Sequence, residues 1–210
     1  MLQTVSRQTL ERLPDYLNIL KSISLKGVRN VSAKAIADAL GLGEIQVRKD
    51  LAAVSSGGKP KIGYISADLI ADLEIFLGYR DVHDAVLVGA GQLGRALMSY
   101  GGFTDYGLNI VTAFDANEEI LFSPIGDKPV LPMNELQDLC MRLKIRIGII
   151  TVPAQQAQGV CDLLVQSGVL AIWNFAPTHL LVPDHILVKN ENMAASLALL
   201  SKHLSERMRQ

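Results

Sequence analysis

The sequence contains little cysteine and few aromatic residues, and neither sign of charge is in excess. Its two cysteines, Cys140 and Cys161, are too few for a disulfide framework and lack the spacing of metal ligands. Both lie in apolar stretches that read as helices, so we expect them to pack in a core. No stretch approaches the roughly 18 apolar residues of a membrane-spanning helix, and the N-terminus has no signal-peptide pattern. These absences predict a cytoplasmic protein with no membrane segment and no metal site.

The two parts of the 210-residue chain differ in charge. The whole chain has 20 Lys and Arg against 21 Asp and Glu, and this balance alone argues against a nucleic-acid-binding protein. Residues 1–80, however, carry 11 basic and 8 acidic side chains, whereas residues 81–210 carry 9 and 13. Such an asymmetry is typical of a nucleic-acid-binding module joined to an acidic domain.

Residues 1–80 show the apolar spacing of helices. Pro14 fits the first turn of the first helix, and Ser32 and Ser66 are placed to cap the second and the last. The predicted elements are helices over 11–25, 33–40, 44–54 (with apolar Ile45, Val47, Leu51 and Val54) and 66–77, a loop over 55–60 and a short strand over 61–65.

The second and third predicted helices form a helix-turn-helix pattern, with Gly41 in the turn. The first turns of the later helix normally carry the side chains that read base edges. An arginine there can pair with guanine, a lysine suits a phosphate, and lysines in the following hairpin can reach the DNA backbone as a wing does. An ordinary helical hairpin is the alternative. The candidate DNA-binding residues are Gln46, Arg48, Lys49, Lys59 and Lys61, and Asp50 lies in the same turns.

Beyond residue 80 the chain alternates continuous apolar runs with helical patterns, which indicates a parallel sheet covered on both faces. The boundary between the two parts falls near residues 78–84. The predicted strands cover 85–88, 109–114, 145–152 and 169–175, and the predicted helices cover 93–100, 133–143 and 154–166.

A G-x-G-x-x-G motif follows the first of these strands and opens the first of these helices. Gly89 permits a tight turn, Gly91 lets the backbone approach a pyrophosphate, and Gly94 allows close packing of helix and strand. The pyrophosphate would then lie on free N–H groups at the helix N-terminus. A glycine turn without a ligand is the alternative. The motif residues are Gly89, Ala90, Gly91, Gln92, Leu93 and Gly94.

Further candidate ligand residues lie at the ends of the later strands. Asp115 ends the second predicted strand, where a carboxylate can bind both hydroxyls of an adenosine ribose and repels a 2′-phosphate. This favours NAD⁺ or NADH over the 2′-phosphorylated forms, although a solvated turn aspartate is the alternative. Ligands of open α/β sheets bind at the carboxyl ends of strands, but a proline can also simply end a strand. The remaining candidates are Thr151, Val152, Pro153, Phe175 and Pro177.

A final amphipathic helix is predicted over residues 191–207. Its apolar face can pack on its own domain or against a second subunit, and a DNA-reading dimer needs such an interface. The chain has no Tyr-x-x-x-Lys pair, and its four histidines lie near no acid or nucleophile motif. A dinucleotide site without catalytic residues favours sensing over turnover.

Six segments together carry a resemblance to a known family: Arg12-Leu13-Pro14-Asp15-Tyr16-Leu17, Gln46-Val47-Arg48-Lys49-Asp50-Leu51, the glycine motif with its flanks, Tyr100-Gly101-Gly102-Phe103, Ala113-Phe114-Asp115 and Asn174-Phe175-Ala176-Pro177. With these segments the chain resembles the Rex family of bacterial redox-sensing transcriptional repressors along nearly its whole length. The resemblance implies a homodimer on an inverted-repeat operator in double-stranded DNA, and a Rossmann domain that binds NADH or NAD⁺. It also implies that NADH disfavours the DNA-competent state and that the C-terminal helix is swapped between subunits.

The sequence departs from the family pattern in three places. Residues 52–58 replace an aromatic and glycine-rich run, Gln92 replaces a usual Asn, and Asn192 stands where an acid is common. We predict an α/β protein with a winged-helix domain over 1–80, a Rossmann domain over 81–189 and a dimerisation helix over 190–210. An NAD-dependent oxidoreductase with a helical appendage and a CoA-binding protein are the alternatives to a repressor without catalytic residues.

Overall fold

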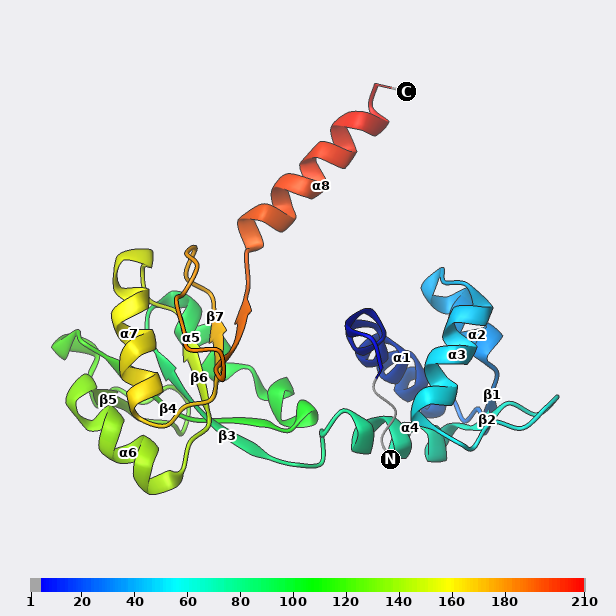
Figure 1. Cartoon of the computed structure of the whole chain (residues 1–210), viewed down its shortest axis with the longest axis horizontal. Coiled ribbons are helices and arrows are strands. Elements are labelled where there is room, and N and C mark those ends of the chain that lie inside the picture. Colours follow the sequence, from blue (N-terminus) through cyan, green and yellow to red (C-terminus); the bar gives the residue numbers. More distant parts are fainter. Residues whose placement is uncertain (1–4, 210) are drawn as a thin grey trace. The chain divides into compact units, whose positions relative to one another are not determined.

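The structure, a computed structural model, describes residues 5–209. The chain divides between Asp81 and Val82 into two compact units, which we call unit 1 and unit 2 (Figure 1). Unit 1 is helical apart from one pair of short antiparallel strands. Its elements are α1 (Arg7–Leu25), β1 (Asn30–Val31), α2 (Ala33–Leu40), α3 (Glu44–Val54), β2 (Tyr64–Ile65) and α4 (Ser66–Phe76).

The helix-turn-helix of unit 1 has the predicted bounds. Ser32 caps α2 by accepting a hydrogen bond from the backbone N–H of Ala35 at 3.1 Å. Gly41 ends α2 in the left-handed conformation, with φ of 66°, which glycine adopts without strain. Local capping signals therefore set both limits of α2.

Three other predictions for unit 1 are wrong. Helix α1 begins at Arg7, because Ser6 accepts a hydrogen bond from Thr9 N–H, so Pro14 lies inside the helix and not in its first turn. The strand predicted over 61–65 is reduced to Tyr64–Ile65, because Lys61 and Gly63 have positive φ of 64° and 82°. Ser66 does not cap α4; it is the first helical residue, and its hydroxyl donates to the Val28 carbonyl instead.

Unit 2 is a six-stranded parallel sheet in the order β5-β4-β3-β6-β7-β8. The order reverses at β3 and β6, as in the doubly wound Rossmann fold. The strands are β3 (His83–Val88), β4 (Leu108–Asp115), β5 (Val130–Pro132), β6 (Ile147–Ile150), β7 (Ala171–Asn174) and β8 (Leu187–Asn190). The helices are α5 (Gln92–Ser99), α6 (Leu136–Leu143), α7 (Ala154–Gln166) and α8 (Met193–Arg207), with 3₁₀-helices η1 (Gly101–Tyr106), η2 (Glu118–Ile120) and η3 (Met133–Glu135).

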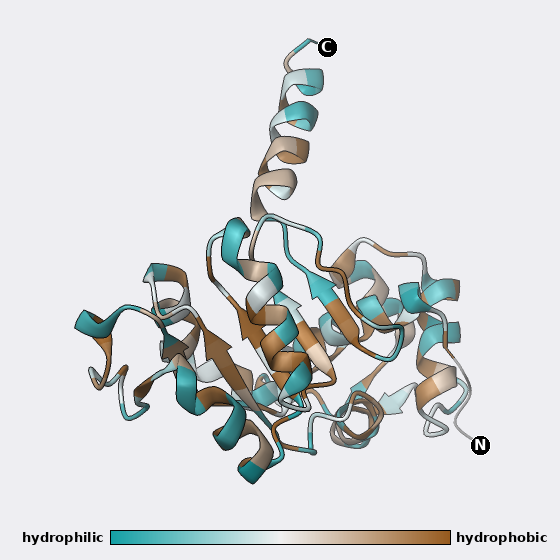
Figure 2. Cartoon of the chain, turned by 60° about the vertical axis from the view of Figure 1, so that its left-hand side comes forward, coloured by the Kyte–Doolittle hydropathy of each residue, from teal (hydrophilic) through white to brown (hydrophobic). Residues whose placement is uncertain are grey.

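Most strands of unit 2 are hydrophobic (Figure 2). The core of this unit divides into two clusters of buried side chains. One contains α6 and α7 side chains, including Cys140 and Cys161, which are fully buried as predicted. Burial raises the pKa of the Cys140 thiol to about 11. The other cluster contains Met98 of α5 together with β3 and β4 side chains. Helix α7 has its predicted bounds, whereas strands β5 and β8 were not predicted, because only three and four residues of them pair in the sheet.

The C-terminal helix α8 begins at Met193, capped by Asn192, and not at Glu191. None of its described residues is buried, and its large apolar side chains are exposed. No helix among residues 5–209 combines the length and apolar character needed to cross a membrane.

Candidate functional site

The glycine loop joins β3 to α5 and fits the backbone requirements of the motif. Gly89 has φ of 104°, and a Cβ there would lie 2.9 Å from the Thr151 carbonyl carbon. A Cβ on Gly94 would lie 2.0 Å from the Gly89 oxygen, so the third glycine permits the close packing of α5 on the loop. Around Gly91 there is open space within 4 Å of a Cβ position, and no side chain caps the N-terminus of α5. The loop therefore leaves room, and helix N–H groups, for a phosphate.

Asp115 ends β4 beside this loop. Its Oδ2 accepts a hydrogen bond from Ala90 N–H at 2.7 Å, and its Oδ1 accepts one from Asn117 N–H at 2.9 Å. Each carboxylate oxygen can accept a further hydrogen bond, and the side chain is only partly buried. Asp115 thus orders the loop and can still accept hydrogen bonds from ribose hydroxyls.

Thr151 follows β6 and is held against the glycine loop. Its hydroxyl donates to the carbonyl oxygens of Gly89 at 2.7 Å and Val88 at 3.1 Å. The next residue, Val152, would be 2.9 Å from a Cβ on Gly89, and the exposed Pro153 precedes α7. Their position at the end of a strand predicted these residues as ligand contacts, but it did not indicate that Thr151 fixes the loop.

The segment after β7 is ordered by the fully buried Asn174. Its amide donates to Asn190 Oδ1 and to the Thr178 carbonyl, both at 2.9 Å, and accepts from Ala176 N–H at 3.0 Å. Phe175 continues a row of rings whose neighbouring centroids lie 4.7–5.6 Å apart. The row consists of Tyr100, Phe103, Trp173 and Phe175, and Pro177 lies exposed beyond it.

Parallel pairing brings these residues to one edge of the sheet. The loops after β3, β4, β6 and β7 all leave the carboxyl ends of neighbouring strands, at the point where the strand order reverses. Open α/β sheets bind ligands at this position. Within the described chain, no group of three or more His, Cys, Asp or Glu side chains is arranged to hold a metal ion.

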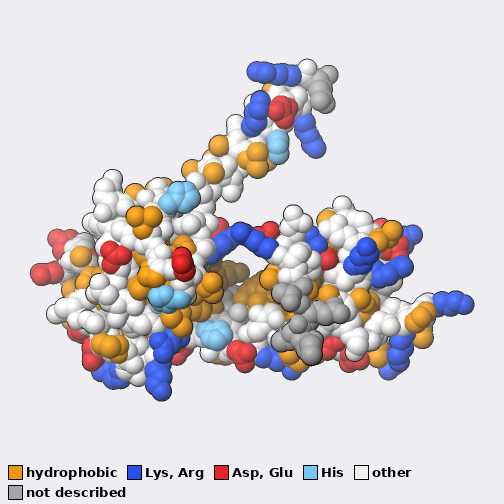
Figure 3. All heavy atoms as spheres, in the orientation of Figure 1, with side chains coloured by type: hydrophobic (Ala, Val, Ile, Leu, Met, Phe, Trp, Pro, Cys, Tyr) orange, Lys and Arg blue, Asp and Glu red, His pale blue; other side chains and the backbone are white. Residues whose placement is uncertain are grey.

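Unit 1 carries a groove of about 600 Å³ between the start of α2, the first turns of α3 and the loop before β2. The loop closes through two 2.9 Å hydrogen bonds between the backbones of Lys59 and Gly63. Lys and Arg side chains gather over this end of the unit (Figure 3). The cations that line the groove are Lys34, Arg48, Lys59 and Lys61. Structure thus brings three predicted DNA-binding residues together and adds Lys34, which the sequence pattern did not indicate.

The exposed face of α3 has Ile45 and Lys49 at its centre. Ile45 is 70% exposed, although the apolar pattern grouped it with the core positions of this helix. Arg48 lies on one side of this face, paired with Glu44, and the exposed Gln46 lies on the other. The two sides are separated because residues 46 and 48 lie about 200° apart around a helix.

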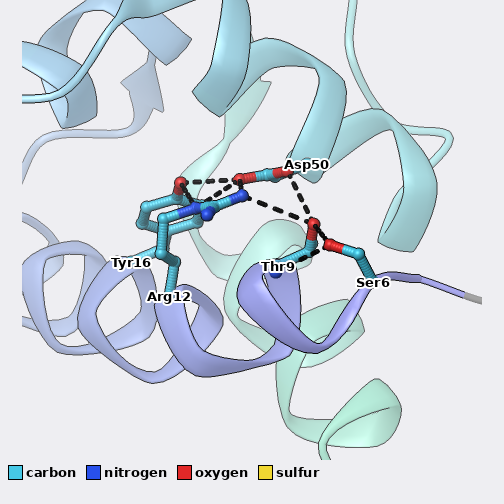
Figure 4. Close-up of polar contacts among 5 residues, drawn as sticks. All are labelled: Ser6, Thr9, Arg12, Tyr16 and Asp50. Carbon is cyan, nitrogen blue, oxygen red and sulfur yellow. Dashed lines mark hydrogen bonds and ion pairs between the residues drawn. The ribbon is translucent and has the colours of Figure 1, made fainter.

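Asp50 is turned away from this face and ties α3 to α1 (Figure 4). Its carboxylate accepts hydrogen bonds from Arg12 Nη2 at 2.7 Å, Tyr16 Oη at 2.8 Å and Thr9 Oγ1 at 3.1 Å. Burial, together with the hydrogen bond to Asp50, raises the pKa of Tyr16 to about 12. Asp50 therefore holds the helix-turn-helix against α1. The sequence placed it in the same turns as the candidate base-reading residues, but its side chain does not share their exposed face.

Comparison with known proteins assigns both units. Residues 81–178 match the family model "CoA binding domain", and residues 4–52 match "Putative DNA-binding protein N-terminus". Among solved structures, the complex of RSP with β-NAD⁺ and operator DNA matches with a TM-score of 0.92 and 32% identity, over 98% of this chain and 95% of that one. The complex of RSP with β-NADH matches with a TM-score of 0.89 and the same identity, over 98% and 97% of the two chains.

A winged-helix unit followed by a Rossmann-type unit defines the class: an α/β transcription regulator with a nucleotide-binding fold. Redox-sensing transcriptional repressors named Rex match at 40% identity in Porphyromonas gingivalis, over 93% of this chain and 90% of the relative, and at 36% in Clostridium beijerinckii, over 97% of each. The chain belongs to the Rex family of redox-sensing transcriptional repressors.

Proposed function

We propose that this protein binds an inverted-repeat operator in double-stranded DNA as a homodimer and releases it when NADH binds. The observation that carries the proposal is that a single chain joins a groove lined by four cations to a glycine loop with open space at Gly91. Its relative RSP has been crystallised with operator DNA and β-NAD⁺, and with β-NADH, which supports the same ligands here.

The proposed cofactor site is the carboxyl edge of the unit 2 sheet. The glycine loop would bind the pyrophosphate on its backbone N–H groups, and Asp115 would bind the adenosine ribose. Thr151 would hold the loop, while Val152, Pro153, Phe175 and Pro177 would line the rest of the site. The cofactor serves as a redox signal in this proposal, so no catalytic residue is assigned.

The proposed DNA surface combines two kinds of contact. Arg48 and Lys49 on α3, with Ile45 between them, would enter the major groove, where Ile45 can contact a thymine methyl group. Lys59 and Lys61 on the loop, together with Lys34, would contact phosphates, which position the protein without reading sequence.

The proposed dimer depends on α8. Met193, Leu197, Leu200 and Leu204 recur at spacings of three and four, and all are more than half exposed. Water contact on such an apolar stripe is unfavourable. A second copy of the chain, with α8 swapped between the subunits, would bury it and would set the spacing of the two α3 helices on DNA.

CoA is the second candidate ligand, because residues 81–178 match the CoA binding domain model. CoA carries a phosphate on its adenosine ribose, and the Asp115 carboxylate would repel it. Isothermal titration of the purified protein with NADH and with CoA separates the two. Tight binding of CoA without affinity for NADH would contradict the proposed cofactor, and steady NADH consumption with carbonyl substrates would indicate an enzyme.

The decisive experiment measures operator affinity with each cofactor form. A ligand releases DNA only through unequal affinity for two states of the protein. Fluorescence anisotropy on an operator selected from random duplexes should show weak binding at saturating NADH and tight binding at saturating NAD⁺. Equal affinities would contradict redox sensing. The variant R48A should lose specific DNA binding and keep its NADH affinity, and loss of both would contradict the division of roles between the units.

A further inference from the structure

Gln46 and Arg12 meet at one edge of the exposed α3 face. With its amide oxygen toward Arg12, Gln46 places that oxygen 3.0 Å from Nη1, 3.1 Å from Nε and 3.2 Å from Nη2. An atom in the guanidinium plane can approach only two of the three nitrogens this closely. The equal distances therefore place the oxygen over the face of the cation, whereas the opposite amide orientation would point N–H groups at it.

Arg12 is itself held by buried partners. Its edge donates to Asp50 Oδ2 from Nε at 2.9 Å and from Nη2 at 2.7 Å, and Nε also lies 3.2 Å from the Tyr16 hydroxyl. The Asp50 side chain is 8% exposed and that of Arg12 is 21% exposed. Two hydrogen bonds to one buried carboxylate fix the plane of the guanidinium. The face that Arg12 turns toward Gln46 is consequently fixed as well.

We propose that Arg12 is a positioning residue that holds the Gln46 amide oxygen, so that Gln46 offers DNA only its two N–H donors. This inference rests on the proposed DNA-binding function of α3. An unrestrained glutamine reads adenine by accepting from its N6 amino group and donating to N7. With the oxygen held by Arg12, Gln46 can only donate, and it therefore favours a base that presents acceptors without an adjacent amino donor, namely guanine with O6 and N7 or thymine with O4. Adenine also offers N7, but its N6 amino group finds no acceptor on Gln46.

The test compares three proteins on random duplex DNA: the unchanged chain, Q46K and Q46E. Lysine keeps only donors and glutamate only acceptors, and the exposed position tolerates both. At the base position that Gln46 contacts, the unchanged chain should bind duplexes with guanine or thymine about tenfold more tightly than duplexes with adenine. Q46K should keep this preference and Q46E should lose it. Adenine at that position, loss of the preference in Q46K, or a uniform loss of affinity for all sequences would each overturn the proposal.

A second variant tests Arg12 directly. R12K keeps a positive charge for Asp50 but has no planar face, so the position read by Gln46 should accept adenine while the positions read by Arg48 keep their preference. R7K, at an exposed arginine of α1, is the matched control and should change neither. If R12K melts at the same temperature as the unchanged chain and keeps the same base preference, the positioning role is overturned. If R12K does not fold, the Gln46 variants decide. Failure of the unchanged chain to select any DNA would contradict the proposed function, whereas selected DNA with adenine opposite Gln46 overturns this inference alone.

Discussion

At the scale of single residues, the buried hydroxyl of Tyr16 couples the stability of unit 1 to pH. Its pKa is raised to about 12 in the folded protein, from an ordinary value of 10. Below pH 10 both the folded and the unfolded chain keep this proton. Between pH 10 and 12 the unfolded chain loses it while the folded chain retains it, so the free energy of unfolding should fall across this range.

The prediction for Tyr16 is checked with Y16F. Urea unfolding of both proteins from pH 9 to 12 should show a steeper fall for the unchanged chain than for the variant, whatever their absolute difference. Burial raises the pKa of both thiols, Cys140 and Cys161, in the unchanged chain and in Y16F alike, so their contribution cancels in the comparison. Parallel pH profiles would show that the Tyr16 hydroxyl does not titrate in this way.

Lys34 carries a second prediction at this scale. It lines the basic groove but forms no part of the core, so K34A should weaken DNA binding without lowering the melting temperature. Loss of one phosphate contact should reduce the slope of log affinity against log salt concentration by about 1 and weaken all sequences equally. K26A, at a lysine outside the groove, serves as the control. A change in base preference in K34A would contradict a pure phosphate role.

The sequence predicted these residues to different degrees. Arg48, Lys59 and Lys61 were predicted as DNA-binding residues because a helix-turn-helix places its base-reading and wing residues at fixed positions, and the structure brings all three to one groove. Ile45 was assigned to the core, since one apolar residue cannot by itself show on which side of a short helix it lies. The contacts of Asp50 reach Thr9 and Tyr16, 41 and 34 residues earlier. Local patterns carry no information about such long-range contacts.

At the scale of elements, the glycine loop depends on a neighbour supplied by another strand. The Thr151 hydroxyl shares its one proton between the Gly89 and Val88 carbonyl oxygens, so T151V removes this shared hydrogen bond while keeping the volume of the side chain. One lost hydrogen bond contributes about 1 kcal/mol, and NADH affinity should fall by about five- to tenfold. T151S, which keeps the hydroxyl, should bind as the unchanged chain does. Titration calorimetry measures all three, and equal affinity in T151V would show that the loop holds its shape without this residue.

The elements that could be predicted are those with local signals. Helices α2, α3 and α7 have their predicted limits, because capping residues, glycines and prolines mark their ends. The predicted strands have displaced ends, and β1, β5 and β8 were missed, because a strand is defined by pairing with a partner distant in sequence. The order of β3, β4 and β6, which forms the proposed cofactor edge, follows the topology expected for a glycine motif after a first strand.

At the scale of the whole molecule, the proposed dimer makes α8 the link between DNA binding and association. Its apolar stripe has no buried residue in one chain, so L200E should place a charge in the proposed interface and shift the protein from dimer to monomer in sedimentation experiments. Two half-sites bound by one dimer gain affinity from their linkage, so the monomer should bind a full operator no more tightly than a single half-site.

Unit 2 keeps its glycine loop in this variant, so loss of NADH affinity would show that α8 completes the cofactor site. K202Q, on the opposite side of α8, should remain dimeric. A dimeric L200E with unchanged operator affinity would exclude α8 as the element that couples the subunits.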